Sequence, residues 1–223
     1  MTPFIKSLAL SIVISIAAQA GVITKITSAG ALGANDTAAW GTAADDFTSV
    51  ASPYGVTSGN GVGVSASLTG GFTIFVQNGV AYASNFFPGD VILATFPTEG
   101  TVRIDFNTAI SGVGFNIAHD NLGAFSGSIS FFGAGNVLFS TINTYSGTSS
   151  TASDGSAAFW AGISSATDIT RIDISVNPAG GTSGFAIGQL NLLTSTAVPE
   201  PSSIGLLSLG LAACGLLRRH RKQ

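Results

Sequence analysis

The sequence has little cysteine, histidine and charge. Its 223 residues include one cysteine, Cys214 near the C-terminus, and two histidines. One cysteine excludes a disulfide within the chain, and these counts exclude metal sites built from clusters of cysteine and histidine. Charged residues make up 9% of the chain and hydrophobic residues 45%, which is not the composition of a disordered protein.

Basic residues are scarce throughout the central part of the chain. Between Gly21 and Pro201 three basic residues stand against eleven acidic ones, which gives this part a net charge of about −8. The other five basic residues lie at the two ends. A basic nucleic-acid footprint is therefore absent, and we expect no nucleic-acid partner.

The N-terminal segment has the pattern of a secretory signal. Lys6 precedes an apolar run from Leu8 to Ala18, and Ala18-Gln19-Ala20 offers small residues at the two positions that signal peptidase requires. We therefore predict that residues 1–20 are a signal peptide cut after Ala20. The alternative is an uncleaved membrane anchor, for which the run is short.

The C-terminal segment has the pattern of a membrane anchor. Residues 202–217 carry no charge, and as a helix they would span about 24 Å, somewhat less than the roughly 30 Å hydrocarbon core. The basic end of residues 218–223 contains Arg218, Arg219, Arg221 and Lys222. Because such clusters stay cytoplasmic, we predict a transmembrane helix at 202–217 with the body on the far side of the inner membrane. The alternative is a buried helix that ends the domain.

These terminal residues resemble the PEP-CTERM sorting tail of Gram-negative bacteria. Val198-Pro199-Glu200-Pro201 matches the motif that names the family, and an apolar helix and a basic end follow it. The resemblance covers residues 197–223. It implies processing by an exosortase, which is a membrane-embedded cysteine transpeptidase, and delivery to the cell surface or the exopolysaccharide matrix.

The body, residues 21–196, is rich in short segments where apolar and polar residues alternate. This pattern predicts an all-β fold, an antiparallel sandwich or barrel, and we favour the sandwich. Residues 29–71 are less regular, and we expect loops, weak strands and one short helix at 37–47 there. Residues 144–156 read as a long exposed loop. The expected strands are 72–76, 91–96, 102–106, 113–117, 129–132, 137–142, 158–163, 172–176 and 185–193.

The body also resembles the β-sandwich domains of other PEP-CTERM proteins. Val113-Gly114-Phe115-Asn116-Ile117 and the segment 184–190 carry this resemblance. It implies a jelly-roll-like sandwich related to carbohydrate-binding modules. Gly188 and Gln189 stand where such relatives have an acidic pair, so the resemblance does not imply a calcium site there.

One charge pattern occurs twice in the body. Arg103-Ile104-Asp105 and Arg171-Ile172-Asp173 each place an arginine and an aspartate on one face of a predicted strand. We interpret both as solvated faces whose charges have partners on neighbouring strands.

Few residues suit catalysis or metal binding. His119 is the one histidine of the body, and beside Asp120 and Asn121 it reads as a polar turn, so we predict no catalytic residues. Asp45 and Asp46 are adjacent, which favours a loop or helix start over a catalytic pair. We expect no cofactor. An all-oxygen calcium site using Asp90, Asp120 and Asn121 stays open as an alternative.

Exposed aromatic rings are the candidates for sugar binding, because such a ring can stack on the apolar face of a pyranose. Trp160 lies in an apolar segment and is expected in the core, whereas Tyr54 and Tyr145 are expected to be exposed. We predict a non-enzymatic structural or interaction protein of the exopolysaccharide layer. The alternatives are a carbohydrate-binding module and, less favoured, a secreted hydrolase. The candidate aromatic residues are Trp40, Tyr54, Tyr82, Tyr145 and Trp160.

Overall fold

The computed structural model describes most of the body. It covers residues 21–41, 48–68, 72–76, 85–95, 100–166, 168–178 and 184–195. The predicted signal peptide and the predicted sorting tail lie outside these ranges. Among the described residues, no helix has the length and apolar character that crossing a membrane requires.

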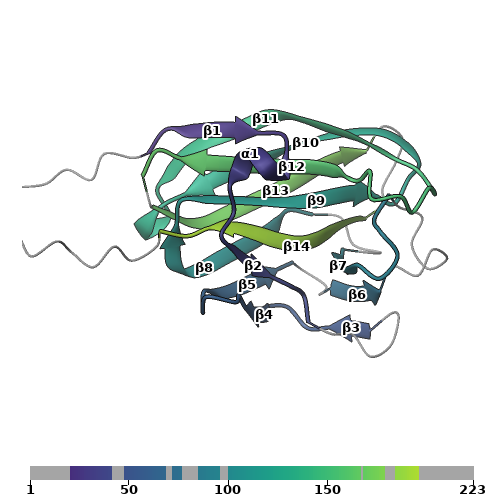
Figure 1. Cartoon of the computed structure of the whole chain (residues 1–223), viewed down its shortest axis with the longest axis horizontal. Helices are drawn as coiled ribbons and strands as arrows, with labels where there is room; N and C mark the ends of the chain where they lie inside the picture. Colours follow the sequence, from purple (N-terminus) through teal and green to yellow (C-terminus); the bar gives the residue numbers. More distant parts are fainter. Residues whose placement is uncertain are drawn as a thin grey trace, which may run out of the picture.

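Within these ranges the chain forms two antiparallel sheets (Figure 1). We call the larger one sheet A and the other sheet B. Sheet A has eight strands, in the order β1 (Ile23–Ile26), β12 (Ala158–Ser164), β9 (Gly112–His119), β14 (Phe185–Leu193), β7 (Val91–Ala94), β6 (Phe72–Val76) and β3 (Thr48–Val50), with β2 (Asp36–Ala38) also paired to β14. Sheet B has six, in the order β11 (Leu138–Ser149), β10 (Gly123–Phe132), β13 (Ile169–Pro178), β8 (Val102–Ile110), β5 (Gly63–Ser67) and β4 (Tyr54–Thr57).

The strands from β7 onward follow a jelly-roll-like order. Four of them, β7-β14-β9-β12, are neighbours in sheet A, and the other four, β8-β13-β10-β11, are neighbours in sheet B. Apart from the β10–β11 hairpin, each strand in this series is followed by one in the opposite sheet. The predicted antiparallel sandwich is thus confirmed for the body.

A single apolar cluster fills the space between the sheets. In β8 the side chains of Val102, Ile104 and Phe106 are buried while Arg103 and Asn107 are exposed, which is the alternation expected of a strand with one face on a core. Trp40 and Trp160 belong to the same cluster, together with residues from both sheets. The outer face of sheet A is also partly covered, because Leu32 of α1 (Ala29–Leu32) packs over β9 and Phe86 anchors a second, smaller cluster.

The nine segments predicted as strands all contain strands, and two of them, β6 and β14, have the predicted bounds. The prediction of a long loop at 144–156 is wrong for its first part, because β11 continues to Ser149. The prediction of a helix at 37–47 is wrong where the structure describes it, since Thr37 and Ala38 belong to β2. Residues 42–47, with Asp45 and Asp46, lie outside the described ranges.

Candidate functional site

A β-bulge in β14 opens a hollow on the outer face of sheet A. Ile187 pairs with Ile117 of β9 and Leu190 pairs with Phe115, so β14 has one residue more than β9 between these pairs. The bulge falls at Gly188 and Gln189, and Gln189 is exposed. A bulge disrupts the ladder locally and redirects side chains, which is why bulges often occur at functional sites.

The residues of the bulge are held in place from both sides. The indole nitrogen of the buried Trp40 donates to the carbonyl oxygen of Gly188 at 2.8 Å. A Cβ atom at position 188 would lie 3.3 Å from the Phe86 ring and 3.7 Å from Cβ of Asn116. Gly188 is thus closely packed, and the exposed Gln189 beside it lines the hollow.

A turn before β7 forms the opposite wall. Asp90 N donates to the carbonyl oxygen of Phe87 at 3.1 Å, and Phe87 N donates to Oδ2 of Asp90 at 3.0 Å. Pro88 and Gly89, the latter with a φ of 94°, occupy the two central positions, where they suit a type II turn. The turn presents Phe87, a residue that is 56% exposed and whose ring packs on one side against Gly155.

The hollow, of about 380 Å³, combines amide groups, one carboxylate and an aromatic ring. Amide side chains both donate and accept hydrogen bonds, and an exposed ring offers an apolar contact surface. This combination suits a neutral ligand with many hydroxyl groups. We call it the bulge hollow, and its lining residues are Ala39, Phe86, Phe87, Gly89, Asp90, Val91, Asn116, Gly188, Gln189 and Asn191.

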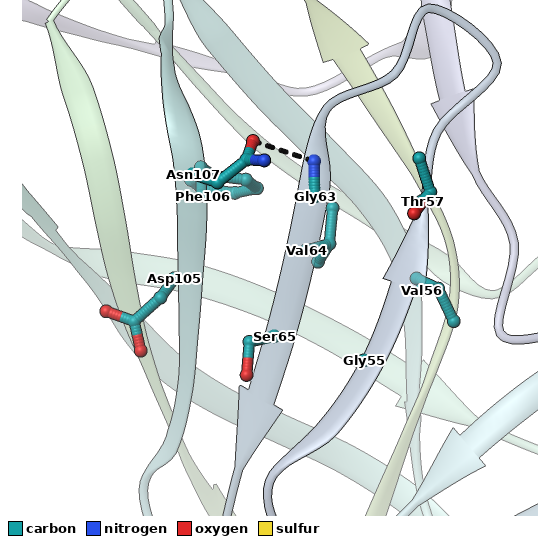
Figure 2. A pocket seen from close by; sticks show the side chains of 9 residues that line it. All are labelled: Gly55, Val56, Thr57, Gly63, Val64, Ser65, Asp105, Phe106 and Asn107. Carbon is teal, nitrogen blue, oxygen red and sulfur yellow. Dashed lines mark hydrogen bonds between the residues drawn. The ribbon is translucent and has the colours of Figure 1, made fainter.

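A second, more open hollow lies over β4, β5 and β8 (Figure 2). Two of its polar side chains, Asn107 and Asp105, already have partners. Asn107 Oδ1 accepts from Gly63 N at 2.8 Å, and the Asp105 carboxylate binds Arg103. The bulge hollow is therefore the better candidate, since the exposed Gln189 and the Phe87 ring are presented to solvent there.

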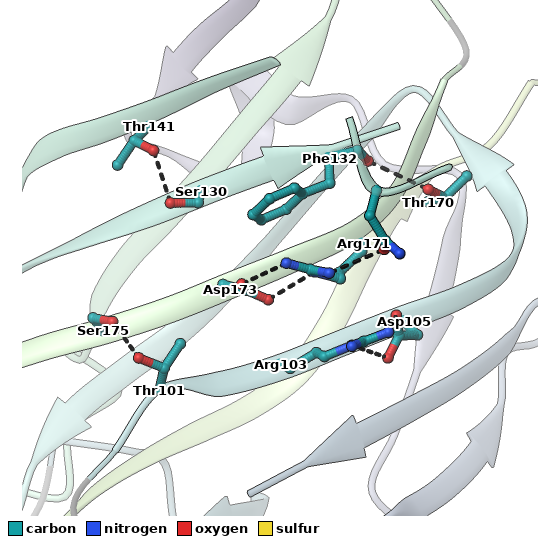
Figure 3. Close-up of polar contacts among 11 residues, drawn as sticks. Thr101, Arg103, Asp105, Ser130, Phe132, Thr141, Thr170, Arg171, Asp173 and Ser175 are labelled. Carbon is teal, nitrogen blue, oxygen red and sulfur yellow. Dashed lines mark hydrogen bonds and ion pairs between the residues drawn. The ribbon is translucent and has the colours of Figure 1, made fainter. Parts of the chain in front are cut away.

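The two repeated charge motifs lie directly opposite each other on β8 and β13. Arg171 pairs in register with Asp105, and Asp173 pairs with Arg103. The ion pairs, however, run along each strand: Arg103 Nε to Asp105 at 2.7 Å and Arg171 to Asp173 at 2.9 Å (Figure 3). The predicted cross-strand neighbours exist, but the direct ion pairs are within strands because an arginine reaches two residues along its own strand face.

These four residues, which we call the charge square, differ in environment. The Arg103 side chain is 47% exposed, and its hydrogen bond to Asp105 raises the pKa of its guanidinium. The Arg171 side chain is 15% exposed, lies 3.8 Å from the centre of the Phe132 ring, and donates to Asn136. The charge square is thus locally neutral and is packed most firmly at Arg171.

The outer face of sheet B beside the charge square is rich in hydroxyl groups. Ser130 and Thr141 form a 2.8 Å hydrogen bond between β10 and β11, and Thr101 and Ser175 form one of 2.9 Å between neighbouring strands (Figure 3). The face therefore offers hydrogen-bonding groups with balanced charge. We call it the hydroxyl face; besides these residues it includes Ser126, Ser128, Thr144, Ser146 and Thr148.

His119 is the last residue of β9, and the turn predicted around it begins at Asp120. The side chain is 1% exposed. Its Nδ1 accepts from Asn121 N at 3.0 Å, while its backbone N donates to Ser149 Oγ at 2.7 Å. The imidazole therefore organises the turn into β10 from a buried position.

The candidate aromatic residues differ from the prediction in which of them are buried. Trp160 is in the core as expected, but Tyr145 was predicted to be exposed and is buried, with its ring stacked on Trp160 at 5.2 Å. Trp40 is fully buried, and Tyr54 is half-buried with its hydroxyl donating to the Trp40 carbonyl oxygen. Tyr82 lies outside the described ranges.

Sequence reasoning did not single out Phe87, Asn116 or Asn191. The available signal was the Phe-Phe-Pro-Gly-Asp turn at 86–90, which places an aromatic residue at a surface turn. In the described ranges, no group of three or more His, Cys, Asp or Glu side chains could hold a metal ion.

Comparison with protein-family models finds one feature, at residues 197–222, which match the PEP-CTERM protein-sorting motif. The chain carries a PEP-CTERM sorting motif. This motif implies an exported protein with a membrane-anchored precursor that an exosortase processes for the cell surface. A search of curated proteins and a search of solved structures found no match.

The residues that carry the sorting predictions lie outside the described ranges. The match confirms the resemblance drawn from Val198-Pro199-Glu200-Pro201 and the segments after it. The individual roles of Arg218, Arg219, Arg221 and Lys222, and of Ala18 and Ala20 at the N-terminal end, stay predictions.

Proposed function

We propose that this PEP-CTERM protein is a non-enzymatic interaction protein of the exopolysaccharide layer of a Gram-negative bacterium. Its precursor loses residues 1–20 to signal peptidase and is held in the inner membrane by a helix at 202–217. The basic end keeps that helix oriented, and an exosortase releases the body near Pro199-Glu200-Pro201. The observation that carries the proposal is the sorting motif at 197–222.

Physical features support each step. Two prolines flank Glu200, and proline disfavours helices and central strands, so we expect an enzyme to reach this segment in an extended form. It directly precedes the apolar span, within reach of a membrane-embedded protease. The hydroxyl face supports the interaction role, because a hydrogen-bonding surface with balanced charge suits contact with hydrated polysaccharide.

The sorting step is tested by following the mass of the mature chain. The full chain and its Glu200→Ala variant are expressed in hosts with and without an exosortase, and surface material is analysed by mass spectrometry. We expect the wild-type body to lose the apolar span and the basic end in the exosortase host alone, and the variant to keep them. Glu99→Ala, which changes another glutamate, serves as the control. A wild-type surface form that retains Leu217 would contradict the proposal.

The bulge hollow favours a second candidate function, binding of a defined glycan. Phe87, a residue that is 56% exposed, lines the hollow with Gln189, Asn116 and Asp90, which together offer an apolar ring, donors and acceptors. Sugar-binding sites need these elements, because each sugar ring has an apolar face and a rim of hydroxyl groups.

This candidate is tested with the exported wild-type chain on a glycan array, followed by titration calorimetry with any glycan retained. Phe87→Ala and Gln189→Ala are each expected to weaken binding at least about tenfold, in line with a loss of about 1.4 kcal/mol. Leu122→Ala removes an exposed apolar side chain elsewhere and is the matched control. Equal binding by all four proteins would exclude the bulge hollow as the site.

A further inference from the structure

The first residues of the described chain are clamped by the loop between β12 and β13. Gly21 N donates to Oδ2 of Asp168 at 2.9 Å. Val22 N donates to Ser165 Oγ at 3.0 Å, and Ser165 N donates back to the Val22 carbonyl oxygen at 3.0 Å. Residues nearly 150 positions apart in the sequence are thus joined by three hydrogen bonds just before β1 begins.

A side chain at Gly21 would displace the groups around it. The residue is buried, and a Cβ atom there would overlap Ser164 Oγ and lie 3.0 Å from the Asp168 carboxylate and 3.2 Å from Ala166 N. Ser164 Oγ in turn donates to Oδ1 of Asp168 at 2.5 Å. The serine therefore fixes one carboxylate oxygen while the other faces the nitrogen of Gly21.

Cleavage after Ala20 would change the chemistry of that nitrogen. In the uncut chain it is an amide with one hydrogen and no charge. In the cut chain it is a primary amine, which is mostly protonated at neutral pH and has three donors. Hydrogen bonds between an ammonium and a carboxylate are about twice as strong as neutral ones. The two arginine ion pairs of the described ranges do not involve Asp168.

We propose that Asp168 is the binding site for the α-ammonium group that signal peptidase creates at Gly21. The proposal rests on the cleavage step of the proposed function. Removal of the signal peptide then also creates an ion pair between Gly21 and Asp168. This ion pair holds the residues just before β1 against the loop between β12 and β13. The uncut precursor has only the amide hydrogen bond at this place.

The contact between Gly21 and Asp168 lies beside β1, an edge strand of sheet A. β1 is a four-residue edge strand, and it pairs with β12 from Ile23 opposite Ser164 to Ile26 opposite Ala161. Its Lys25 Nζ donates to the carbonyl oxygen of Thr144 in β11 of the other sheet. A short edge strand has few contacts of its own, so an ion pair at Gly21, two residues before the strand, adds a large share of the interactions that hold it.

The test compares four chains: cut and uncut at the N-terminus, each with Asp168 and with the Asp168→Asn substitution. The full chain is exported in a host without exosortase, so that all samples keep the same tail, and N-terminal sequencing establishes the first residue. Uncut chains come from an Ala18→Leu/Ala20→Leu variant. Thermal unfolding is followed by the fluorescence of Trp40 and Trp160, both buried. Asp168→Asn is expected to lower the Tm of the cut chain by about 5–10 °C and that of the uncut chain by less than half as much.

A second test does not depend on the folding of Asp168→Asn, because it measures how fast the α-amino group of the cut chain is acylated. Acylation of the α-amino group by an activated ester at pH 7.5 is compared with acylation of Lys222 in the same molecule. We expect the α-amino group to react about tenfold more slowly in the wild type than in a chain with one serine inserted between Ala20 and Gly21, which keeps Asp168. Gly21→Ala, whose Cβ would overlap Ser164, is expected to react as fast as the inserted chain.

The outcomes separate this proposal from the one it rests on. If the exported chain begins at Met1, the export step itself is wrong. If it begins at Gly21 but Asp168→Asn destabilises cut and uncut chains equally, or if the amine reacts equally in all chains, only the binding of the α-ammonium group by Asp168 is wrong.

Discussion

Tyr145 connects three strands from both sheets. Its ring stacks on Trp160 of β12, its hydroxyl donates to the Ala161 carbonyl oxygen at 2.5 Å, and Lys25 Nζ of β1 lies 4.8 Å from its ring centre. Burial of this hydroxyl raises the pKa of Tyr145, because the charged phenolate would lose its hydration. The residue thus makes the edge formed by β1 and β11 sensitive to alkaline pH.

We predict that stability falls above pH 10 in a way that depends on Tyr145. An unfolded tyrosine releases its proton near pH 10, while the folded one holds it to higher pH, so the unfolded state is favoured progressively as pH rises through this window. Tyr145→Phe is expected to cost about 1–2 kcal/mol at pH 8, through the lost hydrogen bond. The difference from wild type should shrink between pH 10 and 11 in urea unfolding followed by circular dichroism. Parallel pH curves for the two proteins would contradict the assignment.

A second prediction at this scale concerns which face of a strand is buried. Phe115 is fully buried in β9, whereas Arg103 is on the solvent side of β8. Phe115→Ala is expected to lower the free energy of unfolding by about 3–5 kcal/mol, because it leaves a cavity in the core. Arg103→Ala is expected to cost only about 0–1 kcal/mol, because its ion pair is largely exposed. Urea unfolding measures both, and similar losses would contradict the assigned faces.

At the scale of elements, prediction from sequence succeeded where large apolar residues alternate. β8, with Val102, Ile104 and Phe106, is such a strand. Where small or polar residues occupy the inner face, it predicted only weak strands without bounds: in β5 the buried residues are Val64 and Ala66, between Gly63 and Ser67. The second half of β11 was missed for a related reason, since its inward residues include Tyr145, Gly147 and Ser149, which give no apolar period.

The charge square yields a prediction about strand pairing. Exchanging the β8 charges, with Arg103→Asp and Asp105→Arg together, keeps an ion pair along the strand but places like charges opposite Asp173 and Arg171. We expect a loss of about 0.5–1 kcal/mol at 20 mM salt that decreases at 500 mM. Exchanging the β13 charges as well should recover part of the loss. If the first exchange costs nothing at low salt in urea unfolding, the cross-strand arrangement contributes no stability.

At the scale of the whole molecule, the sandwich and the sorting tail were accessible from sequence, but the bulge hollow was not. The alternation that predicts strands is local, and the sorting motif is contiguous. The hollow instead depends on how β14 pairs with β9, on the extra residue at Gly188 and Gln189, and on the turn at 86–90 packing beside them. These relations are long-range, and no local pattern in the chain specifies them.

The shared core leads to a last prediction about cooperativity. Trp40 lies in the N-terminal part of the body and Trp160 lies in β12, yet both belong to one apolar cluster. We therefore expect the Trp40→Phe and Trp160→Phe variants, each with one tryptophan left, to give coincident urea transitions by fluorescence and circular dichroism. A reducing agent should leave both transitions unchanged, because residues 21–195 contain no cysteine. Two separated transitions would mean that the N-terminal strands unfold independently of the jelly-roll-like strands. In that case the Trp40 hydrogen bond to Gly188, which holds the bulge, would be lost before the core of the sandwich opens.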